Sequence, residues 1–200
     1  MSRGLFVVFE GIDGCGKSTH ARRVALAHEA LFVFEPGDTP VGIDLRRWIL
    51  DAATPMTAST EALLLLADRS HHVHSVIEPA LERGRSVVAD RFYASTLAYQ
   101  GYGRGVDLDE LRAATDLAIG DCRPDLTILI DLAPSAANER EARDESDRFE
   151  SADPRFHDRV RQGYLALAAE DTNGWYVVDG AHPESDVAAV IDERLAALRW

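Results

Sequence analysis

The sequence predicts an α/β fold in which helices flank a parallel sheet of five strands. Five short runs rich in β-branched and aromatic residues recur along the chain, and segments with the apolar spacing of helices lie between them. Strands that alternate with helices form parallel, doubly wound sheets, since each helix returns the chain to the same end of the sheet. The strand runs are 5–10, 31–34, 86–90, 126–132 and 175–179.

Seven helices are predicted between and after these strands. Gly84 stands where the third helix should end, and Pro79 should kink that helix or mark its end, because proline has no backbone N–H. Charged residues dominate 138–155, which predicts a mobile surface segment. The length of 200 residues predicts one domain that spans residues 1–200. The helices are expected at 17–28, 41–51, 60–83, 107–119, 134–143, 155–170 and 184–198.

Composition argues against several classes of protein. A formal net charge of −13 repels a nucleic-acid backbone, so we expect no binding to DNA or RNA. The apolar stretch near the N-terminus is too short for a secretion signal or a membrane span, which predicts a cytoplasmic protein with no membrane partner. Cys15 and Cys122 have no paired spacing, so we expect two free thiols in a reducing compartment.

The stretch GIDGCGKST at 11–19 matches the phosphate-binding pattern G-x-x-x-x-G-K-[ST]. It follows a predicted strand and precedes a predicted helix, which is the context that the pattern requires. The glycines let backbone N–H groups turn toward phosphate oxygens, the ammonium of Lys17 reaches the phosphates, and the hydroxyl of Ser18 binds Mg²⁺. Lys17 is the one lysine of a chain with 20 arginines, as expected where a compact cation is needed. The residues predicted to bind ATP are Gly11, Ile12, Asp13, Gly14, Cys15, Gly16, Lys17, Ser18 and Thr19.

Two features narrow the kind of nucleotide-binding protein. A GTPase normally reads guanine with N-K-x-D, and this chain has no second lysine. Motor and transport ATPases usually end a strand in Asp-Glu, whereas the corresponding strand here ends in Asp90 and Arg91. What remains is chiefly a small kinase that moves the γ-phosphate of ATP onto a second bound molecule.

Several stretches of the chain stand in an order and spacing found in a known family. They are FEGIDGCGKST, EPGDT, LRRWILD, ADRSHHVHSVIEPAL, DRFYASTLAYQGYGRG, RPDLTILIDL, SDRFE and FHDRVRQGYLALA. Through them the sequence resembles the thymidylate kinase family, bacterial type, over most of its length. The resemblance implies a P-loop fold of the nucleoside-monophosphate-kinase kind with a short lid at about 138–155. It also implies transfer of phosphate from ATP to dTMP with Mg²⁺, and a homodimer.

The resemblance assigns roles to single residues. Arg91 would clamp the acceptor phosphate at the carboxyl end of a strand, and Arg69 and Gln100 would read the pyrimidine edge. The catalytic residues that it implies are Lys17, Arg91, Arg140, Arg143 and Arg148. The implied dTMP-binding residues are Asp13, Glu35, Arg46, Leu65, Arg69, Arg91, Thr96, Tyr99 and Gln100. The implied metal ligands are Ser18, Asp13 and Asp90.

The stretch DRFYASTLAYQ predicts a further helix that begins near Tyr93. Residues three and four apart are neighbours on a helix, so Thr96, Tyr99 and Gln100 share one face. By resemblance, Tyr99 would lie against C2′ of the sugar, where its ring would exclude a ribose hydroxyl. An ordinary core position for Tyr99 stays open as the alternative.

Two positions, Leu65 and Phe34, depart from patterns common in the family, and Gly14 distinguishes between its two types. Leu65 stands where relatives commonly stack a phenylalanine on thymine, and leucine lacks the aromatic quadrupole. Phe34 stands where many bacterial relatives have arginine, which leaves Arg46 to hold the acceptor phosphate on that side. Gly14 replaces the loop arginine of one family type, so the resemblance assigns the stabilising cation to the lid arginines.

Alternatives to this function stay open at this point. Leu65 and Phe34 also fit a nucleoside or nucleotide kinase with a different acceptor. A nucleotide-binding regulator that has lost catalysis is a second alternative, although the intact Lys17, Ser18 and Arg91 argue against it.

Two further features have a structural interpretation that we favour over a functional one. His71, His72 and His74 have no acidic or cysteine partner at the spacing of a metal site, which predicts a solvated or partly packed helix face. Cys15 stands beside a helix N-terminus, where a thiol can be reactive, but we interpret it as a small residue that fills the loop.

Overall fold

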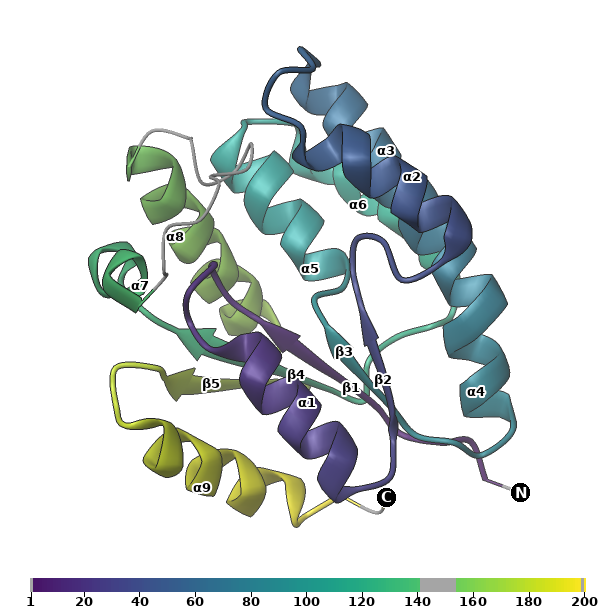
Figure 1. Cartoon of the computed structure of the whole chain (residues 1–200), viewed down its shortest axis with the longest axis vertical. Coiled ribbons are helices and arrows are strands. Elements are labelled where there is room, and N and C mark those ends of the chain that lie inside the picture. Colours follow the sequence, from purple (N-terminus) through teal and green to yellow (C-terminus); the bar gives the residue numbers. More distant parts are fainter. Residues whose placement is uncertain (1, 141–153, 199) are drawn as a thin grey trace.

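The computed structural model describes residues 2–140, 154–198 and 200, and in them a five-stranded parallel sheet has helices on both faces (Figure 1). The strand order is β2-β3-β1-β4-β5, and every neighbouring pair is parallel. The predicted fold class is confirmed, and each predicted strand agrees with the structure to within one residue at either end. The strands are β1 (Phe6–Glu10), β2 (Leu31–Phe34), β3 (Val87–Asp90), β4 (Leu126–Asp131) and β5 (Trp175–Asp179).

The helices follow the predicted order, with one long helix divided into three parts. The stretch predicted as one helix at 60–83 runs as α3, a π-helical segment and α4, and Gly84 follows it at φ +77°. The helix does not end at Pro79, because the chain stays helical to Glu82. The helices are α1 (Lys17–Ala27), α2 (Pro40–Leu50), α3 (Ala58–His72), α4 (Glu78–Glu82), α5 (Tyr93–Thr96), α6 (Leu108–Ile119), α7 (Pro134–Arg140), α8 (Pro154–Glu170) and α9 (Glu184–Leu195), with π-helical segments η1 (Val73–Ile77) and η2 (Leu97–Gly103).

Side-chain caps fix where several helices begin. The hydroxyl of Thr39 accepts a hydrogen bond from Gly42 N at 2.9 Å, and Pro40 occupies the first turn of α2, where its missing N–H costs nothing. The carboxylate of Asp107 accepts from the backbone N–H groups of residues 109 and 110 at the start of α6. These local signals explain why both helices start within one residue of their predicted positions.

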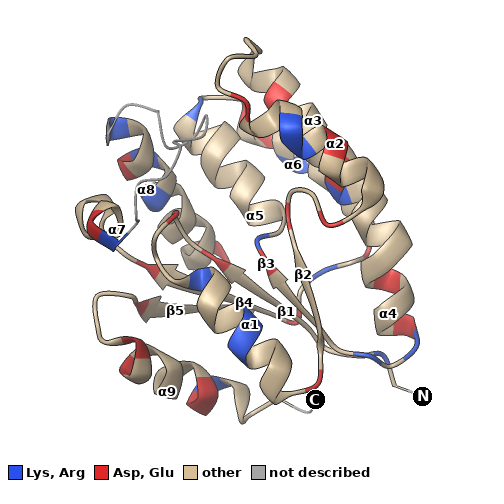
Figure 2. Ribbon diagram, in the orientation of Figure 1, with Lys and Arg blue, Asp and Glu red and all other residues tan. Residues whose placement is uncertain are grey.

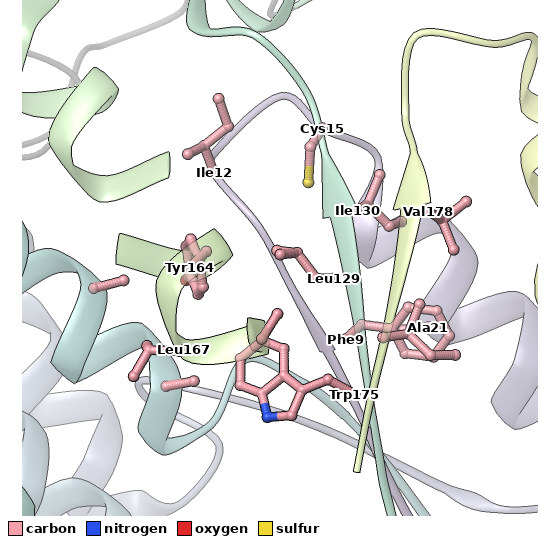
Figure 3. Packing of buried hydrophobic residues seen from close by; sticks show 14 of the residues in the cluster. Phe9, Ile12, Cys15, Ala21, Leu129, Ile130, Tyr164, Leu167, Trp175 and Val178 are labelled. Atoms are coloured by element: carbon pink, nitrogen blue, oxygen red, sulfur yellow. The ribbon is translucent and has the colours of Figure 1, made fainter. Parts of the chain in front are cut away.

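The core lies on both faces of the central strands. Every residue of β1 and β3 is buried, as expected for parallel strands covered by helices on each side. Figure 3 shows Tyr164 and Leu167 of α8 facing Leu129 and Trp175, on the side of the sheet opposite Ala21. Helices α1 and α9 therefore share one face (Figure 1), and a hydrogen bond from Arg23 to Asp192 joins them.

The topology brings three strand ends together. Phe9 pairs with Asp90 across β1 and β3, and Phe34 pairs with Asp90 across β2 and β3. Arg91 N donates to Phe9 O at 2.9 Å, which continues the ladder past the end of β3. In an open parallel sheet the crevice beyond the carboxyl ends of the strands is where ligands bind, so this edge is the place to look for a site.

The predictions for the segment 138–155 and for the helix near Tyr93 have different outcomes. Of the segment 138–155, residues 141–153 lie outside the described residues, and so do Arg143 and Arg148. The helix predicted near Tyr93 is present as α5, and it continues with π-helical winding through η2. In the described ranges, no helix combines the length and the apolar character that a membrane span requires.

Candidate active site

The loop between β1 and α1 has the backbone conformation of a phosphate cradle. Gly11, Gly14 and Gly16 have φ values of +145°, +73° and +94°, which side chains with a Cβ rarely adopt. Lys17 is only 6% exposed, and its Nζ donates to Ile12 O at 3.3 Å and to Asp13 Oδ1 at 3.1 Å. The loop therefore holds a buried ammonium above the end of β1.

Cys15 packs inside this loop. It is buried, and a Cβ built on Gly11 would meet its Sγ at 2.7 Å, so the thiol fills the space under the loop. Burial raises the pKa of the Cys15 thiol, which keeps it protonated and unreactive. The interpretation of Cys15 as a packing residue is confirmed.

A cavity of about 340 Å³ opens beside the loop, at the carboxyl ends of β1, β2 and β3. It brings together residues that are far apart in the sequence. The predicted site residues that line it are Asp13, Lys17, Ser18, Glu35, Arg46, Leu65, Arg69, Asp90, Arg91, Thr96, Tyr99 and Gln100. Lining residues that the sequence did not single out as binding residues are Arg22, Phe34, Pro36, Leu50, Asp68 and Ser95.

The other predicted site residues that the structure describes do not line this cavity. Arg140 is exposed at the end of α7 and is not part of the cavity lining. The loop residues that do not line the cavity are Gly11, Ile12, Gly14, Cys15, Gly16 and Thr19.

Figure 2 shows basic residues on α1 and at the carboxyl end of β3, whereas acidic residues are spread over α4 and α9. The cavity lining itself carries both signs of charge, with the cations Lys17, Arg22, Arg46, Arg69 and Arg91 beside the carboxylates of Asp13, Glu35, Asp68 and Asp90.

Arg91 is held by four side chains at the edge of the cavity. Its guanidinium donates to Asp13, to Tyr99 Oη at 3.2 Å, to Ser95 Oγ at 3.0 Å and to Tyr164 Oη at 3.1 Å. The residue has φ +71°, an uncommon conformation for an arginine that surrounding contacts must maintain. These contacts hold the planar fork of the guanidinium in one orientation at the edge of the sheet.

Asp13 is kept ionised beside this arginine. Burial alone would raise the pKa of the Asp13 carboxyl, but the charges of Arg91 and Lys17 outweigh it and hold the pKa well below its ordinary value. Tyr99 Oη also donates to Asp13 Oδ2 at 2.8 Å. One carboxylate thus joins the loop cation to the cation at the end of β3.

Glu10 holds in place two side chains that contact Arg91, those of Ser95 and Tyr164. Its carboxylate accepts from Phe92 N at 2.9 Å, from Ser95 Oγ at 2.7 Å and from Tyr164 Oη at 3.0 Å, and burial raises its pKa. Sequence reasoning missed this residue, although a carboxylate at the end of a fully buried strand is a signal by itself. Glu10 ties the turn after β3 to β1 and to α8.

A second charged cluster lies at the start of the loop after β2. Arg69 donates to Glu35 Oε2 at 2.8 Å, to Thr96 Oγ1 at 2.7 Å and to Phe92 O at 3.0 Å. His72 Nδ1 lies 3.0 Å from Glu35 Oε1. Burial alone lowers the pKa of His72, but pairing with the carboxylates of Asp38 and Glu35 raises it to about 9.

The cluster corrects part of the prediction for the three histidines. His71 and His74 are exposed, as expected for a solvated helix face, whereas His72 is buried and ion-paired. Its partner Glu35 comes from another element, so spacing along α3 did not reveal it. Within the described ranges, no group of His, Cys, Asp and Glu side chains could form a metal site of three or more such ligands.

We expect the pKa of His72 to make stability depend on pH. Its folded pKa of about 9 lies above its ordinary value of 6.5, so the stabilisation is complete below pH 6.5 and is lost as pH rises through 9. The free energy of unfolding should fall by about 2 to 3 kcal/mol over this interval. Urea unfolding of the wild type and of His72→Gln at several pH values measures it.

The control is the pH dependence of the variant. Asp68 also has a raised pKa, of about 6, caused by burial and by the charge of Glu35, but its titration is largely over below this interval. His72→Gln should therefore have a nearly flat stability between pH 6.5 and 9. A wild type as flat as the variant would contradict a protonated His72 in the folded protein.

The remaining cavity residues offer groups for a base and for a metal. Gln100 is 1% exposed and donates from Nε2 to Glu61 Oε1 at 2.8 Å, while Leu65 adds apolar surface. Ser18, Asp13 and Asp90 supply oxygens to the cavity, and Asp90 Oδ1 is buried with no hydrogen-bond partner among the described residues. An oxygen-only set with one orphaned carboxylate atom fits Mg²⁺, which takes few protein ligands when phosphates supply the rest.

Comparison with known proteins gives consistent matches over nearly the whole chain. A family model described as thymidylate kinase matches residues 9–191. The thymidylate kinase of Desulforudis audaxviator is 45% identical, covering 98% of this chain and 91% of that protein. That of Clavibacter michiganensis is 42% identical, covering 98% and 96%. A crystal structure of thymidylate kinase from Ehrlichia chaffeensis superposes with a TM-score of 0.80 at 29% identity, covering 97% of this chain and 99% of that one.

Proposed function

The chain belongs to the thymidylate kinase family, and we propose that the cavity beside its phosphate loop is where ATP and dTMP react. The protein is an ATP-dependent kinase that transfers the γ-phosphate of ATP to dTMP and forms dTDP. The observation that supports this location is a single cavity lined both by Lys17 and Ser18 of the loop and by Leu65 and Gln100. Such a cavity can accept a phosphate chain and a base together.

The proposed mechanism is positioning and charge stabilisation. Lys17 neutralises charge on the phosphoryl group in transfer, and its ammonium is already buried in the loop. Arg91 holds the acceptor phosphate with its oriented fork, which hydrogen bonds to Ser95 and Tyr164 keep in place. Asp13 stays ionised because its pKa is low, so it can accept a hydrogen bond from a sugar hydroxyl.

Two more cations of the cavity fit the acceptor phosphate. Arg46 donates to Pro36 O at 2.6 Å, and Arg22 lies over the ring of Phe32 at 4.2 Å from its centroid. Both line the cavity next to Phe34, where relatives commonly have arginine. We therefore assign Arg22 as well as Arg46 to the phosphate side, in place of Arg46 alone.

We propose Mg²⁺ as the cofactor, bound by Ser18, Asp13 and Asp90. The orphaned Oδ1 of Asp90 and the hydroxyl of Ser18 are the kind of hard oxygen donors that this ion prefers. When bound, the ion would neutralise the phosphate oxygens of ATP. The chain's own part is to hold these oxygens beside one another, with Asp90 buried at the end of β3 and Ser18 exposed in the loop.

The lid arginines remain our proposal for the stabilising cation. Gly14 has φ +73°, and a Cβ at this position would meet Ala137 O at 2.6 Å. An arginine at position 14 would therefore be both strained and obstructed by α7. The loop thus has no place for a second cation beside Lys17 at this position. That absence supports the assignment to Arg140, Arg143 and Arg148.

An acceptor survey tests the function. The purified protein should form ADP rapidly with ATP, Mg²⁺ and dTMP, more slowly with dUMP, and only weakly with dCMP, AMP or thymidine. Product analysis by chromatography should identify dTDP. Faster turnover with another acceptor would point to the alternative that Leu65 and Phe34 suggested, and no ADP formation with any acceptor would point to a regulator.

We expect the ring of Tyr99 to select deoxyribose. Tyr99 is 4% exposed, lines the cavity and lies edge-on to Tyr164 at 6.3 Å between ring centroids, so the ring is held rigidly. In Tyr99→Ala, the preference for dTMP over its ribo analogue, measured as a ratio of kcat/KM, should fall by about 10-fold or more, since steric rejection of a hydroxyl is worth up to about 100-fold.

Tyr99→Phe is the matched control for that experiment. It keeps the ring but removes the hydrogen bond to Asp13 at 2.8 Å. The sugar preference should therefore survive in Tyr99→Phe while turnover declines. An unchanged preference in Tyr99→Ala would remove the ring from sugar selection and return Tyr99 to a packing role.

We also propose a homodimer. Leu63 on α3 and Leu117 on α6 are 64% and 86% exposed, and Trp48 on α2 is 61% exposed. Helices α2, α3 and α6 lie side by side (Figure 1), so these side chains belong to neighbouring elements. Of the apolar residues that neighbour Leu63, Ala62, Leu65 and Leu66 are buried within the chain and are not available to a partner. Sedimentation at micromolar concentration tests the proposal, and a monomer mass would contradict it.

We propose the cytoplasm as the location of this kinase. Cys15 and Cys122 are both buried free thiols, as suits a reducing compartment. Burial also raises the pKa of Cys122, to about 12. Fractionation of the source cells tests this, and recovery of the protein outside the cytoplasmic fraction would contradict it.

A further inference from the structure

A buried carboxylate lies behind the residue that faces the base. Glu61, in the first turn of α3, has a side chain that is 3% exposed and does not line the cavity. Its Oε1 accepts from Gln100 Nε2 at 2.8 Å. Arg104 donates to the same carboxylate from Nε and Nη2, each at 3.3 Å. Gln100, in contrast, is a lining residue of the cavity.

The carboxylate determines which way the amide of Gln100 points. An ionised carboxylate only accepts hydrogen bonds, and an amide has one donor group and one acceptor oxygen. The amide must therefore turn Nε2 toward Glu61, because the opposite orientation would set two acceptors against each other. Arg104 donates to both oxygens of the same carboxylate, so Glu61 faces donors on each side and this orientation of the amide is kept.

The acceptor oxygen of Gln100 is left without a donor. Oε1 is buried and has no hydrogen-bond partner among the described residues, and Gln100 as a whole is 1% exposed. Buried polar atoms in folded proteins are nearly always paired, so an orphan beside a cavity calls for a ligand donor. With Nε2 turned to Glu61, Oε1 is the polar atom that Gln100 can offer to that ligand.

Arg69 supplies the complementary group. Its Nη1 and Nη2 each carry two hydrogens, and one hydrogen of each is donated, to Thr96 Oγ1 and to Phe92 O respectively. The guanidinium thus keeps donor capacity while lining the same cavity as Gln100. The lining therefore offers one donor and one acceptor to a base.

We propose that Glu61 is a positioning residue that fixes the amide of Gln100 so that the enzyme accepts thymine or uracil and rejects cytosine. The inference rests on the proposed function, in which a pyrimidine monophosphate occupies the cavity. Thymine and uracil present a donor at N3 next to an acceptor at O4, which matches Gln100 Oε1 and Arg69. Cytosine presents an acceptor at N3 and a donor amino group at C4, which is the reverse pattern. A free amide could flip to suit cytosine, but Glu61 prevents the flip.

The test gives residue 61 a hydrogen-bond donor as well as an acceptor without changing the shape of its side chain. In Glu61→Gln, the new amide can donate or accept, so Gln100 can present either end to the base. The ratio of kcat/KM for dCMP to that for dTMP should rise by about 10- to 100-fold, the equivalent of one mismatched buried hydrogen bond. The change should lie mainly in the KM for dCMP. Glu193→Gln, an exposed glutamate of α9, is the matched control and should leave the ratio unchanged.

A double variant separates positioning from a general structural role. In a Gln100→Ala background, Glu61→Gln should have no further effect on the dCMP to dTMP ratio, because its effect acts through Gln100. A folded Glu61→Gln variant that loses activity on both nucleotides equally overturns the proposal. So does a ratio that still responds to Glu61→Gln when Gln100 is absent. Thermal unfolding of each variant identifies those that are folded.

Binding to the wild type gives a second measurement that needs no variant. dUMP differs from dTMP by one methyl group, whereas dCMP differs from dUMP at N3 and C4 alone. Calorimetric titration should show dCMP binding at least about 10-fold more weakly than dUMP. Equal binding of dUMP and dCMP overturns the proposal even if Glu61→Gln does not fold. A wild type that phosphorylates neither dTMP nor dUMP contradicts the proposed function instead, so the two failures are distinguishable.

Discussion

Replacing Lys17 with alanine should lower turnover by about 100-fold or more while the protein stays folded. The ammonium is the buried cation of the phosphate loop, and in transfer it would neutralise charge on the moving phosphoryl group. Asp13 keeps its second cationic partner, Arg91, so the variant leaves no carboxylate unpaired. Steady-state ADP formation with saturating dTMP measures turnover, and thermal unfolding measures the fold.

Two controls make this result specific to the charge. Lys17→Met keeps the length of the side chain without its charge and should lose as much turnover as Lys17→Ala. Arg47→Ala removes an exposed cation of α2 that pairs with Asp44 and should leave turnover unchanged. Near-native turnover in the folded Lys17→Ala variant would contradict a catalytic role for this loop.

Arg91→Lys should be nearly as damaging, although it keeps the charge. The guanidinium reaches Asp13, Tyr99, Ser95 and Tyr164 at once, and an ammonium is a point charge that cannot match this planar fork. We expect kcat/KM for dTMP to fall by about 100-fold, because bidentate hydrogen bonding to the acceptor phosphate is lost. The KM for ATP should change little.

The charge-conserving change matters because Arg91 is also structural. Removing its charge would leave Asp13 with Lys17 as its remaining cation, and the loss of an ion partner at this partly buried site would lower stability. Arg91→Lys avoids most of that cost, so circular dichroism and a melting curve should resemble those of the wild type. A kcat/KM for dTMP within about threefold of the wild type, in a folded variant, would exclude Arg91 as the phosphate clamp.

Much of the fold and part of the site follow from short-range patterns. The strands of a parallel sheet are buried on both faces and read as continuous apolar runs, so the five strands were predicted to within one residue. The phosphate loop was predicted because its function depends on consecutive residues, whose glycines have the positive φ values expected. The helix at DRFYASTLAYQ was also predicted, and Thr96, Tyr99 and Gln100 do line one cavity.

The tertiary structure alone decided which charged side chains act together. Glu10 and Tyr164 are 154 positions apart, Glu35 reaches both Arg69 and His72, and Glu61 meets Gln100 across two helices. No period or spacing in the chain marks such pairs, since each partner lies on a different element. A buried charge is tolerated only where the fold supplies its partner, and that partner is set by how the elements pack. The sequence therefore identified the phosphate loop and the sheet, while the orientation of Arg91, Arg69 and Gln100 depends on carboxylates that only packing brings beside them.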